Sequence, residues 1–529
     1  MSTVRAPEDP PFAFLSPAPH VRLAHAFTRP FENVVATART CYSSKGVVDE
    51  DQASRNPARR DALAKSIYDA GHHTTFQHAH FQFAISNVSR QFLWTFLHSH
   101  PFYNSEQVSQ RYVEVKAGNF AVPPLAGDAR EIFERTARLQ NEAYARLTGL
   151  LVPICGERYF GLFPGRLRGD GRERFAGAVA KRAQEIARYV LPVATFAYLY
   201  HTVSGITLFR YRRICESYDA PAEQRYVVDR MVAEVLALDP LYATVLEDPI
   251  PIEQTPEFAA FRAVADRPGS SARFREEFDA SLGGRTSKLV AWKANNEAVL
   301  ASAVREVLGL ASSEMGDDDA IALCLDPAKN GLLGETLTLT THGKISRAMF
   351  HPGWTFRKKL SHTADSQDQR HRMTPASRPA LPAYLSDAPD YVVPMLVAEV
   401  PEAERLYRET MERTWEAIGA LRARGVSDEF AAYLLPNAVA LRFTESADLL
   451  NLHHKMAMRL CYNAQEEIWT ASREEALQVR EVDPRIGRWL LPPCGLRHAA
   501  GVRPVCPEGD RFCGDVVWRK DVADFSRKL

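Results

Sequence analysis

Residues 185–192 read EIARYVLP, and residues 429–436, which begin 244 positions later, read EFAAYLLP. Both segments start on a glutamate, carry a tyrosine at the same place and end in Leu-Pro. A repeat period of this length is far too long for a solenoid, in which each unit has about 20–50 residues. The repeated octapeptide therefore predicts that the chain is a tandem duplication of a whole domain.

Three shorter matches occur in the same order along the chain. They pair VSR at 88–90 with ISR at 345–347, SQRY at 109–112 with DQRH at 368–371, and RRIC at 212–215 with MRLC at 458–461. The predicted division is a proline-rich tail at 1–20, a first copy at 21–265, a linker at 266–285, a second copy at 286–490 and a Cys-, Gly- and Pro-rich extension at 491–529.

The composition is that of a globular protein with no net charge. The 529 residues include 65 Lys and Arg and 65 Asp and Glu, so no overall field steers the chain toward nucleic acid or an anionic membrane. The uncharged stretch 189–209 is long enough to cross a bilayer, but it contains Pro192, His201, Ser204 and Gly205. We interpret it as a buried core helix or helix pair. Eight cysteines without a secretion signal predict a reducing compartment, the cytoplasm.

The hydrophobic pattern mixes strands with long helices. In the first copy it predicts a strand-like segment within 21–43, a helix over 57–70 that stops at Gly71, a strand over 78–88, a helix after Arg90, and long helices over 128–151 and 172–190. The second copy repeats this pattern at 289–309, 335–345, 393–424 and 428–435. This order predicts α+β domains rather than a doubly wound sheet. The sequence contains neither GxGxxG nor GxxxxGK[ST], the two common phosphate-binding loops.

The SQRY segment offers a hydroxyl, an amide and a guanidinium at consecutive positions. Such a set suits a nucleotide, because Arg pairs bidentately with phosphate and Ser and Gln satisfy a base edge. Arg188 and Arg213 stand in apolar, aromatic-rich segments, where a buried arginine needs a fixed anionic partner. The partner is either an internal carboxylate or a bound phosphate.

Histidines cluster in GHHTTFQHAHF at 71–81, and His98 and His100 follow. They are candidates for a metal site, for cofactor contacts or for satisfied structural positions. The spacing contains no helical HxxxH pair and no neighbouring acidic residue.

Taken in order, GHxT…H, (I/V)SR, SQRY, ARxVLP and FxxxR resemble the flavin-dependent thymidylate synthases, once in each half of the chain. The resemblance implies an α+β fold in which helices pack on a mixed or antiparallel sheet, and active sites shared between four domains. It also implies reductive methylation of dUMP at C5. Methylenetetrahydrofolate would supply the carbon, and NADPH would supply the hydride through FAD. A homodimer of the duplicated chain would reproduce the four-domain assembly, without membrane or nucleic acid as a partner.

The resemblance also implies which residues hold dUMP. In the first copy they are Ser109, Gln110, Arg111, Arg188 and Arg213, with Ser109 as the catalytic residue that positions or polarises the uracil. In the second copy they are Gln369, Arg370 and Arg459, while Asp368 replaces the serine and Ala432 the ARxVLP arginine. We therefore expect the better site to combine the Ser109 loop with Arg459.

For the flavin, the resemblance implies contacts from His72, Thr74 and His78. The family's RHR triplet aligns with His98-Ser99-His100 in the first copy and with Thr355-Phe356-Arg357 in the second, so that His98, His100 and Arg357 are the implied contacts. The Asn and Arg expected after the VLP segment are replaced in both halves, by TVSGITLF and TESADLLNL. The alternative is a non-catalytic nucleotide-binding or scaffolding paralogue that has lost the flavin.

The extension carries Cys494, His498, Cys506 and Cys513 within 20 residues rich in Gly and Pro. Three thiols and an imidazole are a ligand set for structural zinc. The alternative is a partly ordered tail with free cysteines.

Overall fold

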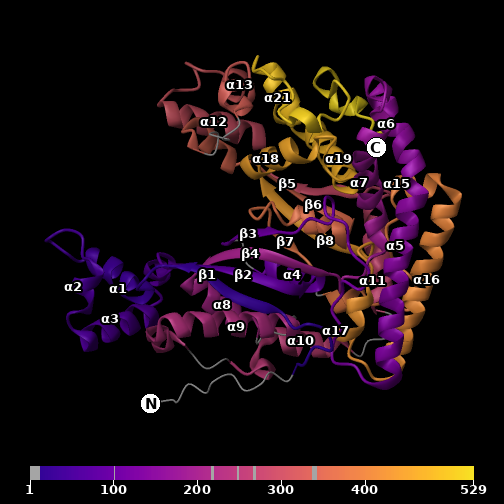
Figure 1. The fold of residues 1–529 in the computed structure, drawn as a ribbon. Helices are drawn as coiled ribbons and strands as arrows, with labels where there is room; N and C mark the ends of the chain where they lie inside the picture. Colours follow the sequence, from indigo (N-terminus) through magenta and orange to yellow (C-terminus); the bar gives the residue numbers. More distant parts are fainter. Residues whose placement is uncertain are drawn as a thin grey trace.

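The computed structural model describes residues 12–99, 102–215, 220–246, 250–265, 270–335, 342–379 and 381–529. Two four-stranded antiparallel sheets lie one above the other (Figure 1), with strand orders β1-β2-β4-β3 and β5-β6-β8-β7. Their bounds are β1 His20–Ala26, β2 His80–Ser89, β3 Asn104–Gln107 and β4 Phe196–Ser204, then β5 Ser287–Trp292, β6 Gly353–Ser361, β7 Ala376–Ser377 and β8 Ala440–Asp448. Antiparallel sheets accompanied by helices confirm the predicted α+β class, and the equal strand order of the two sheets fits a duplication.

The first sheet is accompanied by ten helices among the described residues. They are α1 Pro30–Thr40, α2 Glu50–Ser54, α3 Pro57–Asp69, α4 Arg90–His98, α5 Gly127–Leu162, α6 Gly171–Arg174, α7 Ala176–Ala187, α8 Gly205–Ile214, α9 Ala222–Leu238 and α10 Pro256–Ala265. Helix α3 ends as predicted, because Gly71 adopts a positive φ of 76°. The segment 21–43 contains residues 21–26 of strand β1, as predicted, and then helix α1. Residues 189–209 form a short 3-10 turn, strand β4 and the start of α8, so the predicted helix pair is wrong.

Within the part of the chain that is described, no helix combines the length and apolar character needed to cross a membrane.

The second sheet has its own set of helices. They are α11 Ser270–Leu282, α12 Asn296–Leu308, α13 Asp317–Leu325, α14 His362–Asp368, α15 Met395–Glu399, α16 Pro401–Ala423, α17 Asp428–Ala431, α18 Leu449–Arg459, α19 Glu466–Val482, α20 Pro484–Gly487 and α21 Pro493–Ala499. Most of the segment predicted as a linker is helix α11, whose Phe278 and Leu282 are buried. Residues 336–341, within the predicted element at 335–345, lie outside the described residues.

A serine ends the second strand of each sheet and caps the next helix. Ser89 Oγ accepts a hydrogen bond from Phe92 N at the start of α4, and Ser361 Oγ accepts one from Ala364 N at the start of α14. These serines are therefore equivalent positions. The pairing of VSR with ISR is wrong, because residues 345–347 lie in a 3-10 turn that precedes β6.

Each capping serine is bonded to a buried glutamate, which also accepts a hydrogen bond from a tyrosine of the other copy. Ser89 N and Tyr433 Oη both donate to Glu223, at 2.7 Å each. In the second copy Ser361 Oγ donates to Glu467 at 2.6 Å, and Tyr189 Oη donates to it at 2.8 Å. The two copies are thus locked together by matching contacts.

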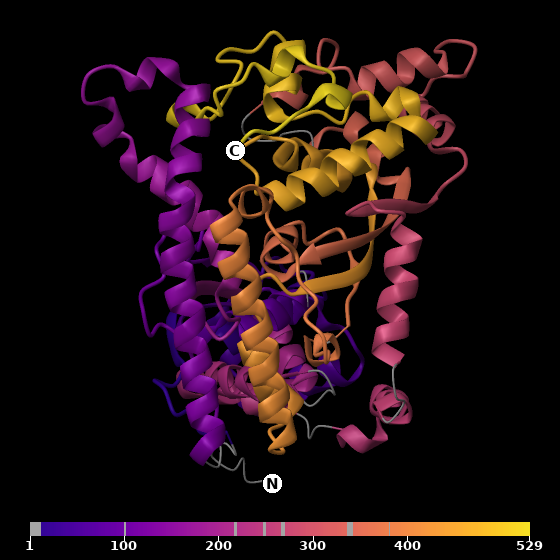
Figure 2. The same ribbon diagram turned by 90° about the vertical axis from the view of Figure 1, so that its right-hand side faces the viewer.

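The repeated octapeptides meet in the middle of the molecule. Val193 N donates to Leu435 O, and Asn437 N donates to Leu191 O, each at 2.8 Å. This reciprocal pair is what a local two-fold axis between the copies produces. Helices α5 and α16 run side by side in opposite directions (Figure 2), and their apolar faces build one core shared by both copies.

Candidate functional site

The SQRY segment forms a turn directly after β3. Ser109 Oγ accepts a hydrogen bond from Arg111 N at 3.2 Å, which closes the turn. Gln110 is buried, and its Oε1 accepts from Asn437 Nδ2 of the second copy at 3.1 Å. Gln110 Nε2 is buried without a hydrogen-bond partner in the described structure. The turn therefore leaves one amide donor unused inside the protein.

Arg111 reaches from the turn to both copies. Its Nε lies 2.6 Å from Glu185 Oε1, and its Nη2 donates to Asn463 O of the second copy at 2.6 Å. Burial lowers the pKa of Arg111, but Glu185 more than offsets this and raises it. The guanidinium is thus held charged at the boundary between the copies.

Arg188 lies beside this pair and is almost completely buried, with 4% of its surface exposed. Its Nε and Nη2 have no hydrogen-bond partner among the described residues. Burial lowers the pKa of Arg188 even though Glu185 opposes this effect. Buried donors on a charged group are costly when left unpaired. The Arg188 side chain is therefore suited to bind an anion that is not part of the protein.

Two more arginines, both partly buried, come from the second copy and the extension. Arg459 Nε donates to His371 Nε2 at 2.9 Å, and Arg527 Nε donates to Leu529 O at 2.7 Å. Burial lowers the pKa of each guanidinium to about 10. For Arg459, Asp368 opposes this lowering of the pKa, while Arg111 and Arg370 contribute to it.

The group of Arg111, Arg188, Arg459 and Arg527 is connected electrostatically, because Arg111, Arg188 and Arg527 all interact with Glu185 and Arg459 interacts with Arg111 and Asp368. Glu185 pairs with Arg111, while burial raises the pKa of the nearby Glu466. Several desolvated guanidinium groups together attract an anion with more than one charge, as a phosphate monoester has.

A cavity of about 380 Å³ lies where the first sheet meets the second copy. It is lined by Gln82, Leu97, Tyr103, Asn104, Ser105, Glu106, Gln107, Tyr200 and Thr202 of the first copy and by Gln369, Arg370 and Arg372 of the second. Arg370 pairs with Glu106 at 3.0 Å, and the Arg372 guanidinium lies 5.0 Å from the centre of the Tyr103 ring. The cavity thus has cationic groups on one wall and aromatic rings on the other.

The capping serines show which residues correspond to the RHR triplet. His98 lies nine residues after Ser89, and Arg370 lies nine residues after Ser361. The second copy therefore has the triplet intact at Arg370-His371-Arg372. The alignment with Thr355–Arg357 is wrong, because those residues lie inside β6, where the Arg357 guanidinium sits 5.6 Å from the Phe278 ring centre.

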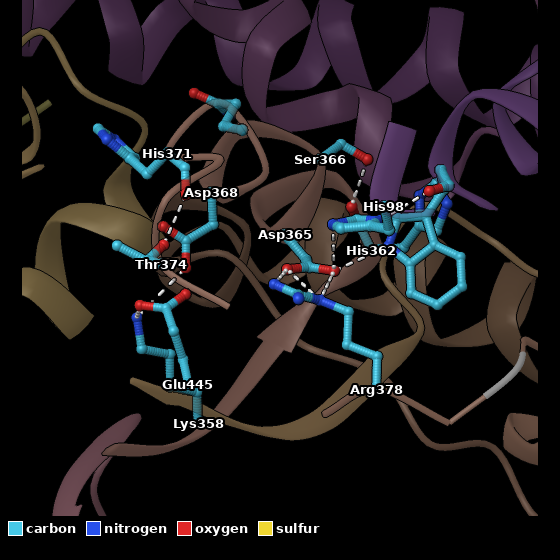
Figure 3. A network of polar contacts seen from close by, with 12 residues as sticks. His98, Lys358, His362, Asp365, Ser366, Asp368, His371, Thr374, Arg378 and Glu445 are labelled. Carbon is cyan, nitrogen blue, oxygen red and sulfur yellow. Dashed lines mark hydrogen bonds and ion pairs between the residues drawn. The ribbon is translucent and has the colours of Figure 1, made fainter. Parts of the chain in front are cut away.

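This register also separates DQRH from SQRY. Asp368 is the last residue of α14, and the strand that precedes SQRY in the first copy corresponds to β7 in the second. Asp368 is buried against Lys358 at 3.2 Å (Figure 3). On its other side Lys455 lies 2.7 Å away. Its carboxylate is therefore occupied by two lysines of its own copy, and it also interacts electrostatically with Arg459.

His98 lies at the contact between the two copies. Its Nδ1 lies 2.6 Å from Trp94 O, and its Nε2 lies 3.6 Å from Asp365 of the second copy, which Arg378 binds through two nitrogens (Figure 3). Burial lowers the pKa of His98 to about 4, so it is neutral near pH 7. His98 is not among the residues that line the 380 Å³ cavity. His100 lies outside the described residues.

The remaining site residues predicted from the sequence lie elsewhere in the first copy. His72, Thr74 and His78 are exposed around the 3-10 turn His73–Gln77, and they do not line that cavity either. Arg213 lies near the end of α8. Counted from the residues that cap α8 and α18, Ser204 and Asp448, the position equivalent to Arg459 is Cys215.

Three of the predicted metal ligands do converge, with an unexpected fourth. Cys494, Cys506 and Cys513 line a small cavity together with Cys461, which follows α18. His498 does not line it. Among the described residues, no group of three or more His, Cys, Asp or Glu side chains is arranged to hold a metal ion as it stands, so the zinc set containing His498 is not assembled.

Comparisons with known protein sequences all identify the same family. The family model of the thymidylate synthase complementing protein matches residues 22–241 and 288–485. The flavin-dependent thymidylate synthase of Clostridium tetani is 27% identical over 223 residues, covering 42% of this chain and 83% of the relative. The enzyme of the same name from Nitratidesulfovibrio vulgaris is 28% identical over 225 residues, covering 40% and 81%. Each relative thus aligns over about one copy, whereas the family model matches twice.

A solved structure also matches one copy. The crystal structure of the UMP/dUMP methylase PolB from Streptomyces cacaoi, bound with 5-Br dUMP, is 18% identical, with a TM-score of 0.30. It covers 47% of this chain and 96% of that chain.

Proposed function

The chain belongs to the thymidylate synthase complementing protein family, and from this premise we propose that it methylates dUMP reductively at C5, with methylenetetrahydrofolate as the carbon donor and NADPH as the hydride source through FAD. The observation that carries the proposal is Arg188, a buried guanidinium with two unpartnered nitrogens next to Arg111 and Glu185. A nucleotide phosphate supplies the missing anion.

The phosphate subsite draws on both copies. Arg111 and Arg188 come from the first copy and Arg459 from the second, so neither copy alone has the full set. Guanidinium groups bind phosphate through paired, charge-assisted hydrogen bonds, and desolvation strengthens each of them. In this proposal the nucleotide binds once per chain, at the boundary between the copies.

The base is proposed to lie against the SQRY turn. Gln110 Nε2 is the unused donor there and would bind a uracil carbonyl oxygen. Ser109, whose Oγ accepts from Arg111 N, would orient the ring at its reacting edge. Catalysis by this chain then consists of orientation and of electrostatic stabilisation around the uracil.

The 380 Å³ cavity is proposed to hold the flavin. Its size is typical of pockets for small molecules, and Arg370, Arg372 and Tyr103 match a planar, anionic cofactor. Bound FAD would supply the hydride. The triplet Arg370-His371-Arg372 links this cavity to the phosphate subsite, because His371 Nε2 accepts from Arg459.

A second candidate is a nucleotide-binding protein without flavin chemistry. Ser204 and Asp448 cap the helices after β4 and β8, within the segments where the family carries its flavin-binding Asn and Arg. This observation favours a chain that keeps dUMP and has lost the cofactor.

The two candidates are separated by a dUMP titration combined with a visible absorption spectrum. Hydrogen bonds to charged groups contribute about 1.5–3 kcal/mol each, so Arg188→Leu is expected to weaken dUMP binding about 100-fold or more. The matched control is Arg138→Leu, an exposed arginine of α5 that pairs with Glu134. Unchanged affinity of the Arg188 variant would contradict the proposal.

The spectrum decides about the cofactor. Flavin bands that survive gel filtration and change on addition of dUMP support the synthase. A colourless protein that binds dUMP supports the second candidate. We further propose a cytoplasmic homodimer with four family domains, which gel filtration with light scattering tests directly.

A further inference from the structure

Four of the eight cysteines surround one cavity. Cys461 follows α18, Cys494 lies in the first turn of α21, and Cys506 and Cys513 lie in the extension. The cavity between them measures about 20 Å³, the size of one water molecule or one ion. None of the four cysteines forms a disulfide. Thiols from three separate chain segments thus converge where a single small occupant would fit.

Clustered thiols bind a cation as thiolates, because the cation stabilises the deprotonated form.

The extension around the cavity has little regular structure to hold it in place. It contains helix α21 of seven residues and three short 3-10 turns. Segments without a core of their own are commonly stabilised by a disulfide or a structural metal. No disulfide is present here, so a metal is the remaining cross-link of this kind.

We propose that Cys461, Cys494, Cys506 and Cys513 bind a structural zinc ion, with Cys461 in the place that the sequence assigned to His498. Four thiolates are a common tetrahedral zinc set, with Zn–S distances of about 2.3 Å. Binding converts four thiols and Zn²⁺ into the tetrathiolate complex and releases four protons.

The thiols are not yet at these distances, since no described group is arranged to hold a metal, and the sulfur atoms must move inward as the ion binds.

The zinc ion would also support the proposed nucleotide site. Cys461 lies two residues after Arg459 and two before Asn463. Asn463 O accepts from Arg111, and Asn463 Nδ2 donates to Arg511 O of the extension. A metal at Cys461 therefore fixes the loop between these contacts. The inference does not depend on the proposed function, because metal content is measured without substrate.

The test is the zinc content of the full-length protein, purified reduced and without chelator. We expect about one zinc ion per chain in the wild type, in His498→Ala and in Cys41→Ser, and less than about a tenth of that in Cys461→Ser and Cys506→Ser. Cys41 is the matched control because it is exposed and lies in the first copy. Zinc kept by Cys461→Ser and lost by His498→Ala would overturn the assignment.

A second measurement avoids variants that fail to fold. Cysteine alkylation followed by mass spectrometry should show these four thiols protected in zinc-loaded wild type and reactive after chelation. Wild-type protein that binds no Zn²⁺ on titration, that carries iron instead, or that forms disulfides among these cysteines would refute the proposal.

Discussion

Seven residues after its capping serine, the first copy has Phe96 and the second copy has Asp368. Phe96 packs against His201 and Tyr211, with ring centres 4.6 and 4.7 Å apart. Burial lowers the pKa of His201 to about 3, so this ring is neutral and part of an aromatic core. Beneath the first sheet, the position is therefore filled by packing.

The second copy has ionised groups at the same positions. Glu445 corresponds to His201 and Lys455 to Tyr211, counted from the caps of the helices that follow β4 and β8. Lys358 lies 3.2 Å from Asp368 and 2.8 Å from Glu445 (Figure 3). It also lies 2.8 Å from Glu475. Although burial lowers the pKa of Lys358, these carboxylates raise it well above its ordinary value.

The difference shows that, after a duplication, the same fold can have an aromatic core in one copy and a buried ionic network in the other. In the second copy, buried ions join β6 and β8 to helices α14, α18 and α19. Since α14 leads into Arg370-His371-Arg372, the network also positions the triplet at the cavity. The first copy, whose aromatic core needs no such pairing, contributes the SQRY turn and Arg188.

The largest expected effect comes from breaking the ionic network. Lys455→Met removes one of its two cations and leaves Asp368 and Glu445 undercompensated. Removing one partner of a buried ion pair costs about 3–5 kcal/mol, so the free energy of unfolding should fall by about that amount. Urea unfolding followed by circular dichroism measures it.

The control is Met231→Leu, at the first-copy position that corresponds to Glu475. A swap that conserves volume there should cost less than about 1.5 kcal/mol. Replacing Lys358, Asp368, Glu445, Lys455 and Glu475 together by apolar residues should recover most of the lost stability. If the Lys455→Met variant were as stable as the wild type, the ionic network would contribute nothing to the free energy of unfolding.

A smaller effect is expected from Glu223, the buried partner of Ser89 and Tyr433. Burial raises the pKa of Glu223 to about 7, against the opposing hydrogen bonds from Ser89 and Tyr433. The folded state therefore keeps a proton that the unfolded state loses, so this stabilisation is complete below about pH 4.5 and is lost as the pH rises to 7. The loss is on the order of 2–3 kcal/mol.

Glu223→Gln should flatten this part of the profile of stability against pH. Glu467→Gln is the matched variant, because Glu467 holds the equivalent contacts in the second copy and burial also raises its pKa. Identical slopes for wild type and Glu223→Gln would show that Glu223 does not titrate in this range.

The smallest effect is expected from the exposed pair of Arg370 and Glu106 that bridges the copies at the cavity. Exposed ion pairs contribute about 0–1 kcal/mol, so Glu106→Gln should leave the urea midpoint nearly unchanged. Destabilisation by more than about 2 kcal/mol would mean that the copies depend on this surface contact rather than on the shared core.

The sequence predicted the large-scale organisation well. EIARYVLP and EFAAYLLP meet in reciprocal hydrogen bonds, and the predicted α+β class and family are confirmed. The prediction for residues 189–209 was wrong, because a short apolar run without charges suits a buried strand as well as a helix. Only pairing of β4 with β2 and β3 distinguishes the two.

The site could be predicted only in part. Because DQRH at 368–371 is similar to SQRY, the two were paired, and the intact triplet at 370–372 was missed. The true register depends on Ser361 and its bond to Glu467, which lies 106 residues further along the chain. Cys461 was likewise outside the segment in which the other three cysteines stand, and only folding brings it to them.

By itself, the sequence determined the duplicated α+β fold and the residue types available for chemistry, because both follow from local patterns. The tertiary structure decided which charged groups meet. It placed Arg111 near Arg459, and it directed Asp368 toward Lys358 and Lys455. The physical reason is that a buried charge is stabilised by whatever lies next to it in space, and most of these neighbours come from distant parts of the chain.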